Sequence, residues 1–275
     1  MAQSLLVRQD ASMSQGPRQV SSPKNPLVRA FRDAAAGEPG DVLLVEGTKL
    51  LREALQAGLA VRVAAVSPRL RDDTLRADLS AAADEFVECA DEVLERMSSV
   101  ETHQGAVAVV ARPDWREPDL LGKGLSPLVV AAAGVRDPGN LGSLLRTAEA
   151  AGATGVLALA GGADPFREKA VRGSMGSVFR LPVMAGLQPQ QVVEFARRHL
   201  LQLVVADGSA NTDYLQADLR RPTLLVVGAE AQGVPVELVR AADQRMRIGI
   251  APAVESLNVA VACGVILFEA RRQRK

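Results

Sequence analysis

Short apolar runs alternate with segments of helical periodicity along most of the chain. In the first half, the apolar runs of strand length are residues 41–47, 61–67, 85–90 and 106–112. Each of the first three is followed by a segment in which apolar residues recur at helical spacing. Strands that alternate with helices in this way predict a small α/β domain.

The segments that flank this domain have a different composition. Residues 1–20 are rich in Ser, Gln, Arg and Met without an apolar period, so we expect a mobile tail, with order beginning near Ser21. Residues 113–126 combine proline, glycine and mixed charge, which is typical of a linker between domains. The pattern therefore predicts a first domain over residues 21–112 and a second over residues 127–275.

The second domain begins with an apolar run, residues 127–135, that no polar residue interrupts. Such a run is typical of a strand buried in a parallel sheet. Further strands are expected at residues 156–160 and 201–207 and before Gly228, with helices between them. The fold class of this half is therefore also α/β.

Three polar corners interrupt the pattern of the second domain, and the first follows residues 127–135. Asn140 is expected to cap a helix, and Arg146 is expected to project from the second turn of that helix. Ligands of open α/β sheets bind beyond the carboxyl ends of the strands, and an arginine so early in a helix opposes the helix dipole. Both points favour a functional site at this corner.

The second corner lies within residues 223–235. A strand is expected to end at Gly228, Glu230 stands in a glycine-flanked loop, and Pro235 is expected to begin a helix. Glycine residues at such a loop allow a ligand to approach the backbone closely.

The third corner begins the last segment, residues 247–275. Ile248 and Ile250 are expected to end a strand, and Ser256 to open a long apolar helix with Asn258 in its first turn. Asn is a poor helix former and is costly to bury alone, so its amide needs a partner. A local contact with Ser256 and a functional contact are both open at this point.

The composition narrows the chemistry. A net charge of zero removes bulk attraction to nucleic acid, and an aromatic content of 3% leaves few residues for base stacking. The two cysteines, Cys89 and Cys263, are expected to be buried in a reducing cytoplasm. Neither histidine, His103 or His199, has a neighbour at ligand spacing, so we expect no metal site. Because no apolar run reaches membrane-spanning length, we expect no membrane association.

In their order and spacing, the three corners resemble the motifs of the SpoU (TrmH-like) branch of the SPOUT RNA ribose methyltransferases. The matching stretches are residues 140–148, 227–234 and 255–262, and the resemblance extends over residues 128–273. Residues 249–252 depart from it, because they read Gly-Ile-Ala-Pro where members usually have Pro-Met-Ala-Gly. The first domain resembles, more loosely, the L30e-like substrate-binding domain that many such enzymes carry.

The resemblance implies a C-terminal parallel sheet that is threaded as a trefoil knot, an exception to unknotted topology. It implies S-adenosylmethionine as cofactor, a homodimer, and methyl transfer to a ribose 2′-hydroxyl of RNA. The residues to which it gives catalytic or pocket-shaping roles are Arg146, Asn140, Glu230, Ser256 and Asn258. The residues that would hold the cofactor through backbone groups are Gly228, Ile248 and Leu257.

Residues with cationic or amide side chains are the candidates for RNA contacts outside these motifs. Lys24, Asn25 and Arg29 lie at the start of the first domain, and Arg172 lies in a basic cluster of the second. A solvated helix face is the commoner role for such charges, so this interpretation competes with a purely structural one.

The alternatives lie within and outside the enzyme class. Ribosomal RNA is favoured over transfer RNA because smaller relatives that act on transfer RNA often lack the separate first domain. A non-catalytic RNA-binding protein on the same scaffold is the second alternative, and the intact Asn140, Arg146 and Asn258 argue against it. A dinucleotide-binding dehydrogenase is the third, but the early strands are not followed by the expected G-x-G-x-x-G.

Overall fold

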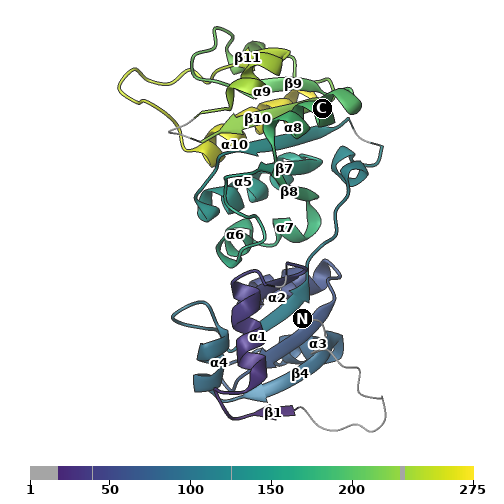
Figure 1. The fold of residues 1–275 in the computed structure, drawn as a ribbon, viewed down its shortest axis with the longest axis vertical. Helices are drawn as coiled ribbons and strands as arrows, with labels where there is room; N and C mark the ends of the chain where they lie inside the picture. The colour runs from purple at the N-terminus through teal and green to yellow at the C-terminus, as the bar shows by residue number, and fades with distance from the viewer. Residues whose placement is uncertain (1–17, 39, 125, 230–232) are drawn as a thin grey trace.

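The computed structural model describes residues 18–38, 40–124, 126–229 and 233–275. Two sheets, each covered by helices, lie end to end in the elongated molecule of Figure 1. The first sheet comes from the N-terminal part of the chain and the second from the C-terminal part. This arrangement confirms the predicted α/β class of both halves.

The N-terminal sheet is mixed, with strand order β1-β4-β3-β5-β2. Its strands are β1 (Arg18–Val20), β2 (Val42–Glu46), β3 (Val61–Val66), β4 (Ala83–Cys89) and β5 (Ala106–Ala111). Strand β5 runs antiparallel to both β2 and β3, whereas β1, β4 and β3 are parallel. Because β1 pairs with β4, Arg18–Val20 belong to this sheet and not to the expected mobile tail; residues 1–17 of that tail lie outside the described residues.

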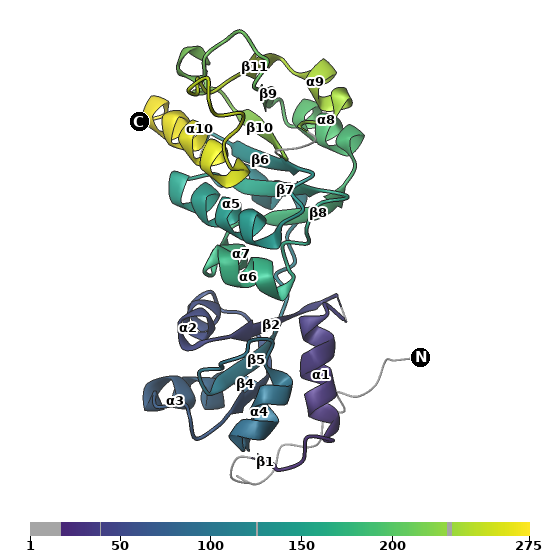
Figure 2. The same ribbon diagram turned by 90° about the vertical axis from the view of Figure 1, so that its left-hand side faces the viewer.

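Two pairs of helices cover the two faces of this sheet (Figure 2). Their bounds are α1 (Pro26–Ala35), α2 (Thr48–Gln56), α3 (Asp73–Ala82) and α4 (Asp91–Met97). Helices α1 and α4 bury Phe31 and Leu94 against one face, and α2 and α3 bury Leu51 and Leu75 against the other.

The predicted linker is partly folded. Residues 117–121 form a 3₁₀ helix, η1 (Glu117–Leu121), whose Leu120 is fully buried beside Gly155 of the C-terminal sheet. Glu117 accepts hydrogen bonds from Arg198 and lies 3.2 Å from the Nε2 atom of His199. The segment is therefore docked onto the second domain.

The C-terminal sheet is parallel throughout, as predicted, and its strand order is β11-β9-β10-β6-β7-β8. Its strands are β6 (Leu128–Ala133), β7 (Gly155–Leu159), β8 (Val183–Leu187), β9 (Gln202–Ala206), β10 (Thr223–Gly228) and β11 (Gln244–Met246). Its helices are α5 (Pro138–Ala151), α6 (Glu168–Ser174), α7 (Ser177–Arg180), α8 (Pro189–Arg198), α9 (Val236–Ala241) and α10 (Val259–Gln273), with a 3₁₀ turn, η2 (Tyr214–Gln216). Helices α5 and α10 lie side by side on one face (Figure 2), and α8 and α9 cover the other.

Two boundaries near the C-terminus differ from the prediction. Strand β11 ends at Met246, so Ile248 and Ile250 lie beyond it in an irregular segment. Helix α10 begins at Val259, three residues after the expected Ser256, because Asn258 caps it. Residues 247–258 therefore form a mostly exposed loop between strand and helix.

The last helix is held down at its end by a half-buried guanidinium. Arg274 donates hydrogen bonds to the carbonyl oxygens of Ser126, Leu219 and Arg221, which precede β6 and β10. Burial lowers the pKa of Arg274 from its usual value. The carbonyl groups, rather than a carboxylate, are the partners that keep this cation in place.

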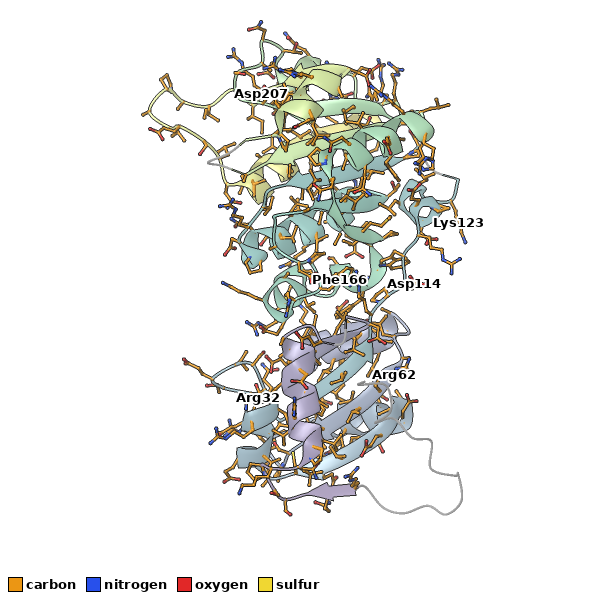
Figure 3. All side chains as sticks on the ribbon, in the orientation of Figure 1. Arg32, Arg62, Asp114, Lys123, Phe166 and Asp207 are labelled. Atoms are coloured by element: carbon orange, nitrogen blue, oxygen red, sulfur yellow. The ribbon has the colours of Figure 1, made fainter. Side chains whose placement is uncertain are left out.

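Arginine side chains join the two domains. Arg172 of α6 forms an ion pair with the buried Glu46 of β2 at 3.3 Å, and Arg180 of α7 pairs with Glu53 of α2. The guanidinium of Arg112 lies 3.6 Å from the ring centre of Phe166, which is labelled between the domains in Figure 3.

Among the described residues, no helix is long and apolar enough to span a membrane.

Candidate active site

The first corner is built on helix α5, which follows the carboxyl end of β6. Asp137, and not Asn140, caps this helix: its Oδ1 atom accepts the backbone N–H of Asn140 at 2.8 Å. Pro138 occupies the first helical position, where its missing N–H costs nothing. The prediction that Asn140 is the cap is therefore wrong, and its side chain is free for another contact.

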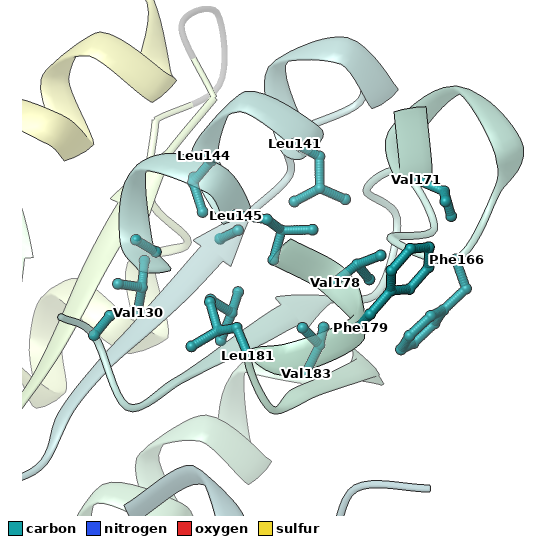
Figure 4. Packing of buried hydrophobic residues seen from close by; sticks show 14 of the residues in the cluster. Val130, Leu141, Leu144, Leu145, Phe166, Val171, Val178, Phe179, Leu181 and Val183 are labelled. Atoms are coloured by element: carbon teal, nitrogen blue, oxygen red, sulfur yellow. The ribbon is translucent and has the colours of Figure 1, made fainter. Parts of the chain in front are cut away.

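Packing fixes the position of α5. Leu141, Leu144 and Leu145 are buried, and Figure 4 shows Leu141 and Leu145 close to Val178 of α7, with Leu144 in the same cluster on the side of Val130. Gly142 touches α6 so closely that an added Cβ would lie 2.6 Å from the carbonyl oxygen of Ala170. Because both contacts are tight, the polar residues of α5 sit on a rigid support.

Arg146 lies in the third turn of α5, one turn later than predicted. Its side chain is exposed and makes no hydrogen bond or ion pair with any residue that the structure describes. In an α-helix, six residues separate Arg146 from Asn140 by about 9 Å along the axis and about 120° around it. The two side chains therefore leave the helix in different directions.

The second corner is the loop after β10, whose last residue, Gly228, pairs in register with Ala133 of β6. A Cβ atom on Gly228 would lie 2.3 Å from the carbonyl carbon of Gly233, so only glycine fits. Ala229 donates its N–H to the carbonyl oxygen of Ala133 and bridges to Gly233. Glu230 lies outside the described residues, and its predicted role stays a prediction.

The third corner meets the first through Asn258. Its Oδ1 atom accepts the backbone N–H groups of Ala260 and Val261, at 3.0 and 3.4 Å, and so caps α10. Its Nδ2 atom donates to Oδ1 of Asn140 at 3.0 Å. Asn258 is exposed, so burial is not what demands these partners; its amide nevertheless has them from its own helix and from α5, and no contact with Ser256 is involved.

The loop before Asn258 offers unused backbone groups. Ile248 and Leu257 are half-buried, Ser256 is exposed, and no hydrogen bond joins the backbone of Ile248 or Leu257 to another described residue. Backbone donors and acceptors beside half-buried apolar side chains suit a flat heterocycle with polar edges. The residues expected to hold an adenosyl group therefore fit that role.

The candidate RNA-binding residues are not brought together in one place. Asn25 caps α1 through its Oδ1 atom, Arg29 lies 3.6 Å from Asp33, and the side chain of Lys24 is exposed without a partner among the described residues. Arg172 lies on α6 in the other domain, where it contacts both Glu46 and Glu168. Its charge is therefore balanced already, which makes it a weaker ligand for phosphate than Lys24.

A family model described as the SpoU rRNA methylase family matches residues 127–268, which hold all three corners. The chain belongs to the SpoU rRNA methylase family. A second model, described as the MRM3-like substrate binding domain, matches residues 37–108. The two matches correspond to the C-terminal and N-terminal sheets of this SpoU protein.

Relatives and solved structures agree with this assignment. A methyltransferase of Synechocystis sp., described as an uncharacterized tRNA/rRNA methyltransferase, is 33% identical over 93% of this chain and 94% of its own length. The 23S rRNA (guanosine-2′-O-)-methyltransferase RlmB of Pseudomonas syringae is 36% identical over 62% of this chain and 71% of its own. The AdoMet-bound crystal structure of an rRNA methyltransferase from Sinorhizobium meliloti matches 93% of this chain and 97% of that one, with 31% identity and a TM-score of 0.81. This SpoU protein is accordingly an S-adenosylmethionine-dependent RNA 2′-O-methyltransferase.

The thiol of Cys263, beside the third SpoU motif, does not add a nucleophile. Burial raises the pKa of the Cys263 thiol in α10 to about 12, so this thiol stays protonated and inert at neutral pH.

The cap of α5, Asp137, was not among the predicted residues, although an aspartate directly before Pro138 is a recognisable helix start. The contact between Asn140 and Asn258, for which no local signal exists, was not predicted either.

Proposed function

We propose that this SpoU methyltransferase modifies the ribose 2′-hydroxyl of a nucleotide in ribosomal RNA. One observation carries the site assignment: Asn140 and Asn258, from two distant motifs, are hydrogen-bonded at the carboxyl ends of the parallel strands. Ligands of such sheets bind at that edge. The match of residues 37–108 to a substrate-binding domain, and the names of relatives that act on ribosomal RNA, support the choice of substrate.

The cofactor is proposed to lie between the loop after β10 and residues 247–258. Gly228, Ile248 and Leu257 would hold it through backbone groups, with Glu230 at the pocket wall. When bound, S-adenosylmethionine supplies an electrophilic methyl group on a sulfonium. We also propose that the chain is threaded here as a trefoil knot, as in the family that it resembles.

Arg146 is proposed to bind a phosphate of the substrate and to stabilise the negative charge that develops on the ribose oxygen. A guanidinium remains protonated in proteins, so Arg146 acts as a cation and not as the proton acceptor. Asn140 and Ser256 are proposed to orient the substrate and the loop. Holding the hydroxyl in line with its target accounts for a large part of the rate in such reactions, up to ~7–11 kcal/mol of the barrier.

A homodimer is proposed because the family resemblance implies one, with Arg146 of one protomer working near the cofactor of the other. Arg146 leaves α5 about 120° away from Asn140, as the helix geometry requires. On the neighbouring α10, Val261 and Phe268 are about half-exposed, and Val254 in the loop is 47% exposed. A partner that covers these apolar side chains would place its own Arg146 beside the loop of the first protomer.

The N-terminal domain, proposed as residues 18–112, is assigned to RNA binding through Lys24, Asn25 and Arg29. Residues 113–126 connect it to the methyltransferase domain, residues 127–275. We propose a reducing compartment, the cytoplasm, because Cys89 and Cys263 are buried in separate cores as free thiols.

The test uses the full-length protein, S-adenosylmethionine with a labelled methyl group, and ribosomal and transfer RNA from cells that lack the gene. We expect label in ribosomal RNA at one ribose, mapped by resistance of the adjacent bond to alkaline cleavage. Label only in transfer RNA would contradict the substrate assignment. RNA binding without any transfer would favour the non-catalytic alternative.

A further inference from the structure

The amide of Asn258 has only one orientation that satisfies its neighbours. Two backbone N–H groups at the start of α10 point at one end of the amide, and only an oxygen can accept from them. The other end is therefore the NH₂ group. It faces the Oδ1 atom of Asn140 at 3.0 Å.

The orientation of the Asn258 amide determines the orientation of the Asn140 amide. Because Asn258 is a donor at this contact, Asn140 must present its oxygen there, and its own NH₂ group faces away. That NH₂ group has no hydrogen-bond partner among the described residues. The backbone of Asn140 is held in α5 by Asp137, and its side chain is held by the contact with Asn258, so the oxygen of the amide faces Asn258 and the NH₂ group faces away.

We propose that Asn258 is a positioning residue that turns the amide of Asn140 so that its NH₂ group donates to an acceptor oxygen of the target nucleotide. This inference rests on the proposed function and assigns Asn140 a donor role. Asn140 is not the proton acceptor in this arrangement, because an uncharged amide is not a base at neutral pH. The acceptor is an oxygen of the ribose or of its phosphate.

The variant Asn258→Asp separates this role from helix capping. A carboxylate caps a helix as well as an amide does, and its charge suits a helix start. It cannot donate, so Asn140 would turn its NH₂ group toward Asp at 258 and its oxygen toward the substrate. We expect the melting temperature and cofactor affinity to be kept and the turnover number to fall about 100-fold, as for loss of one donor at a reacting oxygen.

The control is Gln190→Glu, which makes the same chemical change in the exposed first turn of α8 and should leave turnover unchanged. Wild-type turnover by Asn258→Asp would overturn the proposal. Ribosomal RNA transcribed with phosphorothioate linkages distinguishes the two acceptors. A rate loss seen in the wild type but absent in Asn140→Ala indicates a phosphate oxygen, and an equal effect on both proteins indicates the ribose.

A double variant tests whether Asn258 acts through Asn140. Asn140→Ala removes the donor, so adding Asn258→Asp to it should lower turnover by no further factor. If the second change costs the same factor in both backgrounds, Asn258 acts separately and the proposal is wrong.

A third measurement does not depend on methyl transfer. The chain has four asparagines, at positions 25, 140, 211 and 258, so asparagine-selective ¹⁵N labelling gives four side-chain NH₂ signals. In Asn258→Asp, the NH₂ signal of Asn140 should shift and its exchange with water should slow, because it becomes hydrogen-bonded. An unchanged Asn140 signal overturns the inference, whereas a shifted signal in a protein that transfers no methyl group overturns only the proposed function.

Discussion

The two sheets differ in how they use polar residues. In the N-terminal domain the candidate side chains come from one short stretch at the start of α1, and most have a structural partner, as Arg29 has in Asp33 and Asn25 has in the start of α1. In the C-terminal domain Asn140 and Asn258, 118 positions apart, meet each other, while Arg146 has no described partner. Distant polar residues that converge and still have unused donors indicate the catalytic region.

The direction of the strands explains the difference. Every strand of the C-terminal sheet is parallel, so the loops after β6 and β10 and the loop before α10 gather at one edge. In the N-terminal sheet β5 is antiparallel to its neighbours, and its loops divide between two edges. A site built from several loops is therefore expected in the second sheet, and an extended contact surface in the first.

The largest expected effect is that of Arg146→Ala. Removing the cation that stabilises charge on the reacting oxygen should lower the turnover number by at least about 1000-fold, as for arginines that stabilise transferring groups. Binding of S-adenosylmethionine, measured by calorimetry, should remain. Arg197→Ala removes an equally exposed arginine from α8 and serves as the control. A wild-type rate for Arg146→Ala would place the chemistry elsewhere.

Gly142→Ala tests whether the active-site helix depends on its support. The added methyl group would lie 2.6 Å from the carbonyl oxygen of Ala170, so α5 and α6 must separate. Overpacking of this kind lowers the free energy of unfolding by about 1–3 kcal/mol, measurable by urea denaturation. Gly208→Ala, where a Cβ has nothing within 4 Å, is the matched control. Equal stability of the two variants would show that the contact is loose.

A smaller effect is expected from the first domain. Lys24→Ala combined with Arg29→Ala should raise KM for RNA by about 3–10-fold with kcat unchanged. It should also reduce the slope of the logarithm of the RNA-binding constant against the logarithm of the salt concentration by about two. The exposed pair Arg62→Ala and Arg71→Ala removes the same charge from elsewhere in the domain. A fall in kcat would mean that the N-terminal domain takes part in the chemistry, which would remove the contrast between the sheets.

The sequence predicted the elements better than the contacts. Apolar runs such as residues 127–135 identified the strands because burial imposes hydrophobicity along the whole run. The start of α10 was missed because Asn258 acts as a cap, and the start of α5 because Asp137 offers an equivalent oxygen. The motif residues were found through a family resemblance, and the domain boundaries and the knot stay predictions.

What could not be predicted depends on tertiary proximity. No local pattern shows that Asn258 will reach Asn140, or that Arg172 will be neutralised by Glu46 from the other domain. The strand Arg18–Val20 was missed for the same reason, since three residues carry little pattern and are defined by their pairing with β4.

The smallest expected effect concerns pH. Hydrogen bonds from Arg272, and then from Gln273, lower the pKa of Glu269 in α10 to about 2. A lowered folded-state pKa stabilises the protein above the ordinary value near 4.5 and loses this contribution as the pH falls toward about 2. The difference in melting temperature between the wild type and Glu269→Gln should therefore shrink from pH 5 to pH 2. A constant difference over that interval would contradict the assigned pairing.

The hydrogen bonds of Arg274 have a practical consequence for anyone who expresses the protein. Its guanidinium binds the carbonyl groups that precede β6 and β10, one residue before Lys275. A purification tag fused after Lys275 would start beside that half-buried cation and compete for the same space. Cloning with the tag at the opposite end leaves the contact undisturbed, and replacing Arg274 by alanine would leave those carbonyl groups without this donor.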